Sequence, residues 1–238
     1  MTDSIAIVAS AMRADAEALR VISQNVANAQ TPAYRREVPL VYSNFEAAAT
    51  STVVNADPLT LDTSVDLRPG TMQRTGEPLD LAIEGAAFFV VNTANGERLT
   101  RRGDFRLDAE GRIVTPSGEA VLGTNGPIQV QGAKPAIGSD GSVRVNDAVM
   151  DRLKLVEVTS AAALQPEGNG LYAVAAGEEA FDTSAAQVRQ GYLETSNVQS
   201  VDEMISLMET MRRFEAAQRF IHGYDSMVDN AITTLGKV

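Results

Sequence analysis

The chain has 238 residues and a formal net charge of −11, and this charge argues against nucleic acid or an anionic membrane surface as a partner. It has no cysteine and a single histidine, which excludes thiol catalysis, disulfides and thiolate metal sites and weakens a Ser-His-Asp hydrolase interpretation. Apolar residues make up 44% of the chain but aromatic residues only 5%, so the core is expected to be mainly aliphatic.

Residues 3 to about 29 are predicted to form one helix. Alanine is frequent there and Pro32 is the first proline, so the helix is expected to end near Asn28 to Gln30. This N-terminus lacks the basic and apolar regions of a cleavable secretory signal, and no run approaches the roughly 20 apolar residues of a membrane span. Steps of three and four give a narrow seam typical of a coiled coil. The seam comprises Ile5, Val8, Met12, Asp15, Leu19, Ile22 and Val26.

Residues 31–66 are predicted to form an extended arm. Residues 34–36 and 38–45 favour short extended segments, whereas the run from Ala47 to Asn55 is small and polar. The arm has too little apolar surface for a core of its own, so we expect it to lie against something else.

Residues 67–196 are predicted to form an antiparallel β domain. Turn signals such as Asn95-Gly96 and Asn125-Gly126 recur at roughly eight to fifteen residues, with short apolar runs between them. This rhythm is typical of a sandwich or barrel with hairpins. The expected strands are 87–91, 97–101, 105–107, 112–114, 119–122, 128–130, 142–145, 152–158, 171–174 and 188–193.

Residues 197–238 are predicted to hold a second long helix, from about 198 to 235. Ser196-Asn197 is the expected N-cap and Gly236 the expected C-terminal stop. Val201, Ile205 and Met208 form an apolar stripe outside the main seam. The main seam comprises Met204, Leu207, Met211, Phe214, Gln218, Ile221, Asp225, Val228, Ile232 and Leu235.

The predicted fold class is therefore α+β, with an antiparallel β domain inserted between long terminal helices. The helices, in residues 1–30 and 197–238, are expected to pair as in a coiled coil. An alternative is that both pack on the β domain as ordinary core elements, but their narrow seams favour helix-on-helix contact. We expect the two ends to be loose in a single chain and to order when many subunits pack side by side.

No catalytic, cofactor-binding or metal-binding residue is predicted. The 31 acidic residues always provide some carboxylate pair for a glycosidase, but no nucleophile motif or phosphate loop accompanies such a pair. Asp104, Asp108 and Glu110 do not match the spacing of an EF-hand loop and are interpreted as solvated turns. His222 is interpreted as a surface or interface residue.

Three segments together resemble the rod and hook proteins of the bacterial flagellum. Residues 25–35, NVANAQTPAYR, are similar to the N-terminal signature of these axial proteins. Residues 78–91 and 99–114 resemble their central block, and residues 191–204, which begin GYLETSNV, resemble their C-terminal signature. Ala33 stands where the family usually has glycine, which costs about 1 kcal/mol if the turn needs a positive φ.

The resemblance implies a structural, self-assembling subunit of the flagellar rod, which transmits torque from motor to hook. Details in residues 152–156 and 211–215 favour a proximal rod subunit; a distal rod or hook subunit and a soluble coiled-coil adaptor with a β module are the alternatives. The implied partners are other rod proteins, the flagellar type III export apparatus and the basal-body rings. The implied location is the periplasmic part of the basal body, reached without a cleavable signal peptide.

The resemblance also implies that the terminal helices form an inner tube while the β domain faces outward. Asn25 and Asn28 suit a helix end or a neighbouring helix, Pro32 fixes the direction in which the chain leaves, and Tyr34 suits a wet interface. The predicted assembly interface comprises Ile5, Val8, Met12, Leu19, Ile22, Asn25, Val26, Asn28, Thr31, Pro32, Tyr34, Asn197, Val201, Met204, Leu207, Met211, Phe214, Ile221, Val228, Ile232 and Leu235.

Overall fold

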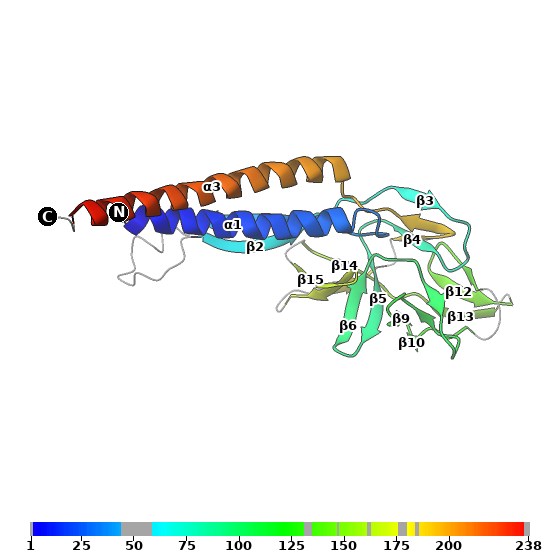
Figure 1. Ribbon diagram of the computed structural model, residues 1–238. Coiled ribbons are helices and arrows are strands. Elements are labelled where there is room, and N and C mark those ends of the chain that lie inside the picture. The colour runs from blue at the N-terminus through cyan, green and yellow to red at the C-terminus, as the bar shows by residue number, and fades with distance from the viewer. Residues whose placement is uncertain are drawn as a thin grey trace. The chain divides into compact units, whose positions relative to one another are not determined.

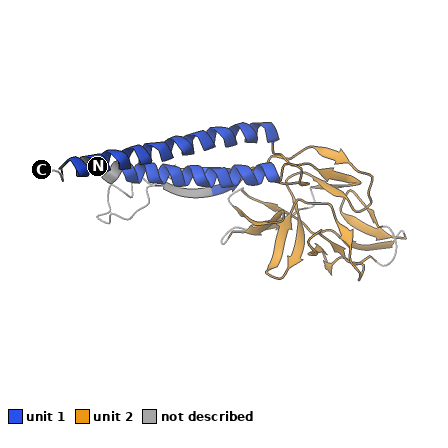
Figure 2. Ribbon diagram, in the orientation of Figure 1, with its two compact units in different colours: residues 1–27, 37–64, 199–238 blue, residues 28–36, 65–198 orange. Residues whose placement is uncertain are grey.

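The computed structural model of the chain describes residues 2–43, 59–130, 135–146, 148–160, 163–175, 180–183 and 186–235. The chain divides into two compact units, shown in Figure 2: unit 1 comprises residues 1–27, 37–64 and 199–238, and unit 2 comprises residues 28–36 and 65–198. The polar run of the arm, Ala47–Asn55, and the helix stop at Gly236 lie outside the described residues. None of the helices described here is long and apolar enough to cross a membrane.

Unit 1 contains helices α1 (Thr2–Ala27) and α3 (Ser200–Leu235), which lie side by side in Figure 1. It also contains β1 (Glu37–Ser43) and most of β2 (Leu59–Val65), which pair with each other. α1 and α3 are 26 and 36 residues long. Both lengths follow from sequences rich in helix formers and free of internal proline.

The start of α3 differs from the prediction. The helix begins at Ser200, and its Glu203 N–H donates to the carbonyl oxygen of Gln199 at 3.0 Å. Ser196 Oγ instead accepts from Val198 N at 3.1 Å, and Asn197 binds other segments of unit 2. The expected N-cap pair is therefore occupied inside unit 2, and acidic residues in the first turn of α3 complement the helix dipole.

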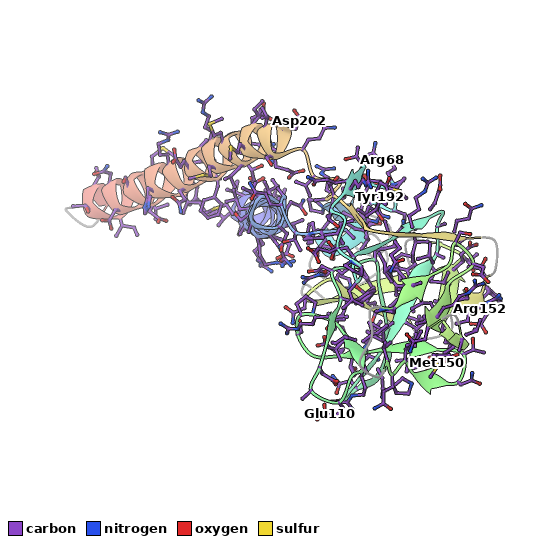
Figure 3. The ribbon with its side chains drawn as sticks, turned by 90° about the vertical axis from the view of Figure 1, so that its right-hand side faces the viewer. Arg68, Glu110, Met150, Arg152, Tyr192 and Asp202 are labelled. Atoms are coloured by element: carbon purple, nitrogen blue, oxygen red, sulfur yellow. The ribbon has the colours of Figure 1, made fainter. Side chains whose placement is uncertain are left out.

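Unit 2 is built from antiparallel strands. Its ten-stranded sheet has the order β15-β16-β6-β5-β9-β8-β7, with β10 beside β9, β14 beside β5 and β17 beside β14. A three-stranded sheet has the order β11-β12-β13, and two further pairs are β18-β4 and β19-β3. Figure 3 shows Met150 and Arg152 on β13 and Glu110 in the turn after β7. The bounds are β3 Met72–Arg74, β4 Leu81–Glu84, β5 Phe88–Thr93, β6 Gly96–Thr100, β7 Arg106–Leu107, β8 Ile113–Val114, β9 Ala120–Gly123, β10 Gly126–Pro127, β11 Ala136–Ile137, β12 Ser142–Val145, β13 Ala148–Arg152, β14 Leu155–Val158, β15 Leu164–Gly168, β16 Leu171–Val174, β17 Ala180–Asp182, β18 Gln187–Gln190 and β19 Tyr192–Glu194.

Most of the predicted strands are present, but the predictions for three of them are wrong. Residues 128–130 are not a strand, although Ile128 and Val130 are buried. The expected strand 152–158 is divided between β13 and β14, and the strand 188–193 is divided at Gly191. Gly191 has a φ of 77° and donates to the carbonyl oxygen of Asp80 at 2.7 Å, so the chain turns there from its pairing with β4 to its pairing with β3.

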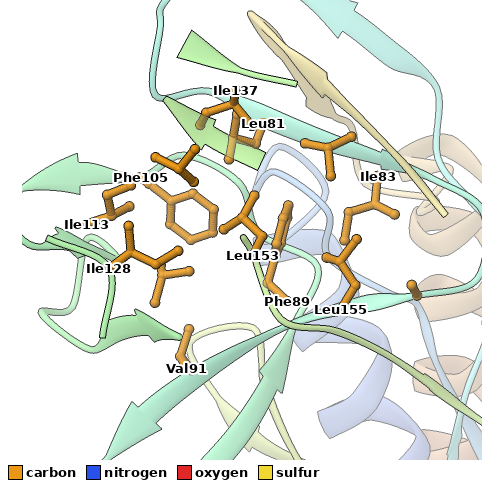
Figure 4. Packing of buried hydrophobic residues seen from close by; sticks show 14 of the residues in the cluster. Leu81, Ile83, Phe89, Val91, Phe105, Ile113, Ile128, Ile137, Leu153 and Leu155 are labelled. Atoms are coloured by element: carbon orange, nitrogen blue, oxygen red, sulfur yellow. The ribbon is translucent and has the colours of Figure 1, made fainter. Parts of the chain in front are cut away.

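The strand β5 contributes to two hydrophobic clusters. Phe89 and Val91 belong to one, and Phe88 and Val90 to the other, because successive side chains of a strand point to opposite faces. Figure 4 shows Phe89 beside Phe105; their rings meet edge to face, with centroids 5.1 Å apart and planes at 81°. The expectation that both phenylalanines of β5 are core residues is confirmed.

Candidate functional site

The N-terminal motif forms a tight turn directly after α1. Thr31 closes it twice, from its backbone N to Asn28 O at 3.0 Å and from its Oγ1 to Asn28 Oδ1 at 3.1 Å. Tyr34 N then donates to Thr31 O at 3.2 Å. Ala33 has a φ of 54°, a left-handed conformation that costs a residue with a Cβ about 1–2 kcal/mol. The position therefore has the geometry of a glycine, and Ala33 is a strained residue in that turn.

Asn25 of α1 binds the first residue of β1 as a neighbouring strand would. Its Nδ2 donates to Glu37 O at 2.8 Å, and its Oδ1 accepts from Glu37 N at 2.9 Å. Its Nδ2 also donates to Glu203 Oε2 of α3 at 3.5 Å. All three residues are buried, so one side-chain amide joins three elements of unit 1.

The carboxyl group of Glu37 lies beside this contact. Burial raises the pKa of Glu37 above its ordinary value; the positive charge of Arg20 opposes that rise, and the negative charge of Glu17 adds to it. The protonated form of Glu37 is thus favoured more strongly in the folded chain than in the unfolded one.

Asn197 of the C-terminal motif joins three segments of unit 2. Its Oδ1 accepts from Arg36 N at 2.7 Å, and its Nδ2 donates to Asp66 O at 3.0 Å and to Arg68 O at 2.9 Å. The side chain of Arg68 extends outward in Figure 3 and is 81% exposed, while its carbonyl oxygen faces this junction. The residue predicted as a helix cap is therefore a cross-link between segments distant in sequence.

A buried ion triad lies beside that cross-link. Glu194 Oε1 forms an ion pair with Arg35 Nη1 at 2.9 Å and accepts from the backbone N of Gly70 at 2.9 Å. Glu194 Oε2 forms an ion pair with Arg101 Nη2 at 2.8 Å and accepts from Arg101 Nε at 3.0 Å. The three side chains are each at most 3% exposed, so both oxygens of the buried carboxylate face positively charged partners.

The guanidinium group of Arg101 is surrounded by backbone carbonyl oxygens and the ring of Phe88. Its Nη2 donates to Ile83 O at 3.1 Å, its Nη1 donates to Gly85 O at 3.0 Å and to Ala87 O, and its guanidinium carbon lies 5.8 Å from the centroid of the Phe88 ring. Burial lowers the pKa of Arg101 from its ordinary value, and the charge of Glu194 acts in the opposite direction. This arginine fixes the segment that leads from β4 into β5.

Backbone segments approach closely at the same junction. Thr195 N donates to Thr71 O at 2.8 Å, and a Cβ added to Gly70 would lie 1.9 Å from Thr195 O. Ala33 N donates to Glu194 O at 2.8 Å, so both the backbone and the carboxylate of Glu194 bind the N-terminal motif. The three motif segments of the sequence therefore meet around Glu194.

Sequence reasoning did not single out Arg35, Arg101 or Glu194. The available signal was that each lies inside one of the three motif segments and that Arg101 directly follows the buried residues Leu99 and Thr100. An ionisable residue in line with core residues needs a charged partner, but the partner itself lies 93 residues away.

The predicted helix seams coincide only partly with the contact between α1 and α3. Ile22 and Asn25 are buried, and the other predicted α1 positions, Ile5, Val8, Met12, Leu19 and Val26, are half-buried. Asp15, also on that seam, binds Arg213 of α3 at 3.1 Å. On α3 the buried or half-buried side chains are at 200, 203, 206, 207, 210, 214, 217, 221 and 224.

One row of the predicted α3 seam therefore faces α1, and the other does not. Leu207, Phe214 and Ile221 lie on the less exposed side, whereas Met204 and Met211 are exposed because Glu203 and Thr210 take their places. Val201, Val228 and Ile232 are also exposed, and the side chain of Leu235 lies outside the described residues. Among the motif residues Tyr34 is buried, and Asn28, Thr31, Pro32 and Asn197 are half-buried.

The acidic turn that invited a calcium interpretation is engaged with arginines. Asp108 Oδ2 binds Arg112 Nε at 2.6 Å, Glu110 binds Arg112 at 3.2 Å, and Asp104 binds Arg102 at 2.7 Å. Within the part of the chain that the structure describes, no group of three or more acidic or histidine side chains is arranged to hold a metal ion. The charged groups around Glu194 likewise pair with one another, and these ion pairs hold chain segments together.

Comparison with family models agrees with this distribution of motifs. The model described as "Flagellar basal body rod FlgEFG protein C-terminal" matches residues 189–234. The model described as "Flagellar hook protein FlgE/F/G D1 domain" matches residues 82–145. The first match contains Glu194 and Asn197 and the second contains Arg101.

Several curated proteins are similar to this chain over most of its length. The flagellar basal-body rod protein FlgF of Caulobacter vibrioides is 30% identical over 92% of this chain and 92% of its own length. FlgF of Mesorhizobium japonicum is 32% identical over 99% of both chains. The rod protein FlgG of Agrobacterium fabrum is 28% identical over 94% of this chain and 96% of its own.

Proposed function

We propose, on the premise that this chain belongs to the family of flagellar basal-body rod proteins, that it is a proximal rod subunit which assembles through its terminal helices. Members of this family are structural components of the basal body and not enzymes, and the same holds for this chain. The assembling surface, the position within the rod and the route to it are the proposed parts.

The observation that carries the assembly proposal is the exposed apolar side of α3. Val201, Met204, Ile205, Met208 and Met211 are between 46% and 70% exposed, in the first part of the helix. Complete burial of a fully exposed side chain of this kind contributes about 1.5–3 kcal/mol, so covering the exposed half of each contributes roughly half of that. A run of this kind on one helix marks a surface for another protein, and we infer that it is covered by the helices of a neighbouring subunit.

The same proposal gives each region of the chain a task. The helices in residues 1–30 and 197–238 form a coiled-coil-like inner layer, called D0 in this family, and order fully on assembly. The β-rich region 67–196 faces outward, and the arm 31–66 bridges neighbours. The three-motif junction supports this division, because it docks the segment after α1 and the segment before α3 on one β-rich unit.

The proposed proximal position in the rod is supported by the sequence identity of this chain to its relatives. Proteins named FlgF are 30–32% identical to this chain, and those named FlgG are 28% identical. Delivery by the flagellar export apparatus without a cleaved signal, a periplasmic position and contacts with the basal-body rings and other rod proteins belong to the same proposal. A distal rod or hook subunit is the alternative within the family.

Deletion of the gene tests the position in the rod. We expect non-motile cells whose purified basal bodies show rings without a complete rod or hook by electron microscopy. Arrest after a proximal rod has formed would assign the chain to the distal rod. Motile cells with normal filaments, in a strain without a paralogue, would contradict a rod function.

Substitution on α3 tests the assembling surface. The double variant Met204→Asp, Met208→Asp changes only exposed side chains, so its free energy of unfolding should change by less than about 1 kcal/mol while motility is lost. Ser117→Asp adds the same kind of charge at an exposed polar position in the turn between β8 and β9 of unit 2 and should leave the cells motile. Normal rods built from the double variant would rule out this surface.

A further inference from the structure

The triad of Arg35, Arg101 and Glu194 joins three chain segments that are distant from one another in the sequence. Arg35 belongs to residues 28–36, a short segment that directly follows α1 and is counted with the β-rich unit although residues 37–64 are not. Arg101 follows β6, and Glu194 ends β19. Docking of residues 28–36 on unit 2 therefore brings a positive charge to a buried place.

The two arginines cannot be buried without the glutamate. Both guanidinium groups are at most 3% exposed, and they are close enough to share one carboxylate. A buried charge without its partner costs far more than the same charge in water, and a pair of like charges adds repulsion. Arg101 retains carbonyl partners at Ile83 and Gly85, but carbonyls carry only partial charge.

Arg35 depends on Glu194 more strongly than Arg101 does. Its Nη1 forms an ion pair with Glu194 and donates to the carbonyl oxygen of Arg68, and its Nε has no hydrogen-bond partner among the residues that the structure describes. Arg101 by contrast donates three bonds to backbone carbonyl oxygens, none of which involves Glu194, and has a ring beneath it. Loss of the Glu194 charge should therefore release the N-terminal segment before it disturbs β4 and β5.

We propose that Glu194 acts as an interlock between the segment that follows α1 and the segment that precedes α3. Residues 28–36 then dock on the β-rich unit only when the C-terminal motif is already in place. The backbone of the same motif completes the interlock, because Ala33 N donates to Glu194 O and Arg36 N donates to Asn197 Oδ1. Neither the segment after α1 nor the segment before α3 then orders alone. The inference concerns the single chain and goes beyond the proposed rod function, which can fail without affecting it.

Amide hydrogen exchange on the full-length chain tests the interlock. In Glu194→Gln, which keeps the shape but removes the charge, the amides of Ala33, Tyr34 and Arg36 should exchange at least tenfold faster than in the unchanged chain. The amide of Ile113, which donates to Ile128 O in the core, should change less than twofold. The matched control is Glu84→Gln, which removes an ion pair with Arg189 in the same unit at a site where both side chains are about half exposed.

A second variant keeps the test decisive if Glu194→Gln does not fold. Arg35→Met leaves the pair of Glu194 and Arg101 intact and should release residues 28–36 by a similar factor while the core stays protected. Adding Arg35→Met to Glu194→Gln should accelerate exchange of that segment by less than twofold more, because both changes remove one contact. The interlock is refuted if residues 28–36 keep their protection in either single variant, or if the core loses protection to the same extent.

Discussion

The core of unit 2 and helix α3 of unit 1 bury different kinds of side chain. In unit 2 the most enclosed residues include Leu81, Ile83 and Phe89, which belong to one continuous cluster. On the described part of α3 the buried residues are Glu203 and Thr210, while most of its large apolar side chains are exposed. Unit 2 therefore covers its large apolar side chains within a single chain, whereas α3 carries apolar side chains that a single chain leaves exposed to solvent.

The largest effect should come from the core of β5. Phe89→Ala removes a ring that is fully buried against Phe105, so we expect a loss of about 3–5 kcal/mol in the free energy of unfolding measured with urea. The matched control is Phe220→Ala on α3, where the ring is 55% exposed and the loss should stay below about 1 kcal/mol. Equal losses of stability at the two positions would contradict the proposed difference between the core of unit 2 and the exposed side of α3.

A smaller effect is expected where unit 1 is held by polar groups. Asn25→Ala leaves the backbone N–H and C=O of Glu37 unpaired in a buried place, which should cost about 2–3 kcal/mol. Amides of β1 should exchange faster, and those of the unit 2 core should not. Asn230→Ala, at an exposed position of α3, is the control and should be close to neutral. Unchanged protection of β1 would show that the amide does not hold this strand.

The strained turn after α1 should respond in the opposite direction. Ala33→Gly relieves a left-handed residue with a Cβ and, after the extra chain entropy of glycine is subtracted, should stabilise the protein by about 0.5–1 kcal/mol. Ala33→Val places a β-branched residue at the same φ and should destabilise it. Thermal unfolding of both variants measures the effect, and a loss of stability in the glycine variant would contradict the assigned strain.

The smallest effect is a pH dependence in unit 1. The pKa of Glu37 is raised in the folded state, so its contribution to stability is fully present below the unfolded-state pKa and is lost as pH rises through the folded-state pKa. The free energy of unfolding of the unchanged chain minus that of Glu37→Gln should therefore fall as the pH rises above about 4. Only this difference reports on Glu37, because Glu17 has a lowered pKa and contributes with the opposite sign. A value of this difference that stays constant or rises with pH would contradict the burial effect.

Local patterns in the sequence predicted the element types well. The helix of α1 follows from alanine content and Pro32, and the hairpins follow from turn signals such as Asn95-Gly96. The face of α3 was harder, because two rows one residue apart have the same heptad spacing. The more apolar row was assigned to the contact, but Glu203 is turned inward, where Asn25 meets it.

The convergence of the three motifs could not be read from spacing. Sequence patterns report what lies three or four residues away on a helix, or two residues away on a strand. The partners of Glu194 are brought together by the pairing of strands that are distant in the sequence. Asn197 was interpreted as a helix cap because the same asparagine amide can either cap a helix or cross-link backbone segments. The positive φ at Ala33 was foreseen only as a condition, and the structure fulfils it.

The exposed face of α3 is unusual in the kind of apolar residue it uses. Met204, Met208 and Met211 are all at least 46% exposed. Methionine is unbranched and polarisable, and it fits partners of different outline with little loss of contact. A methionine-rich surface can therefore pack against partners whose surfaces differ in shape. Under the proposed function, the same helix face can contact another copy of this chain and, at the boundary between two kinds of rod subunit, a related but non-identical subunit.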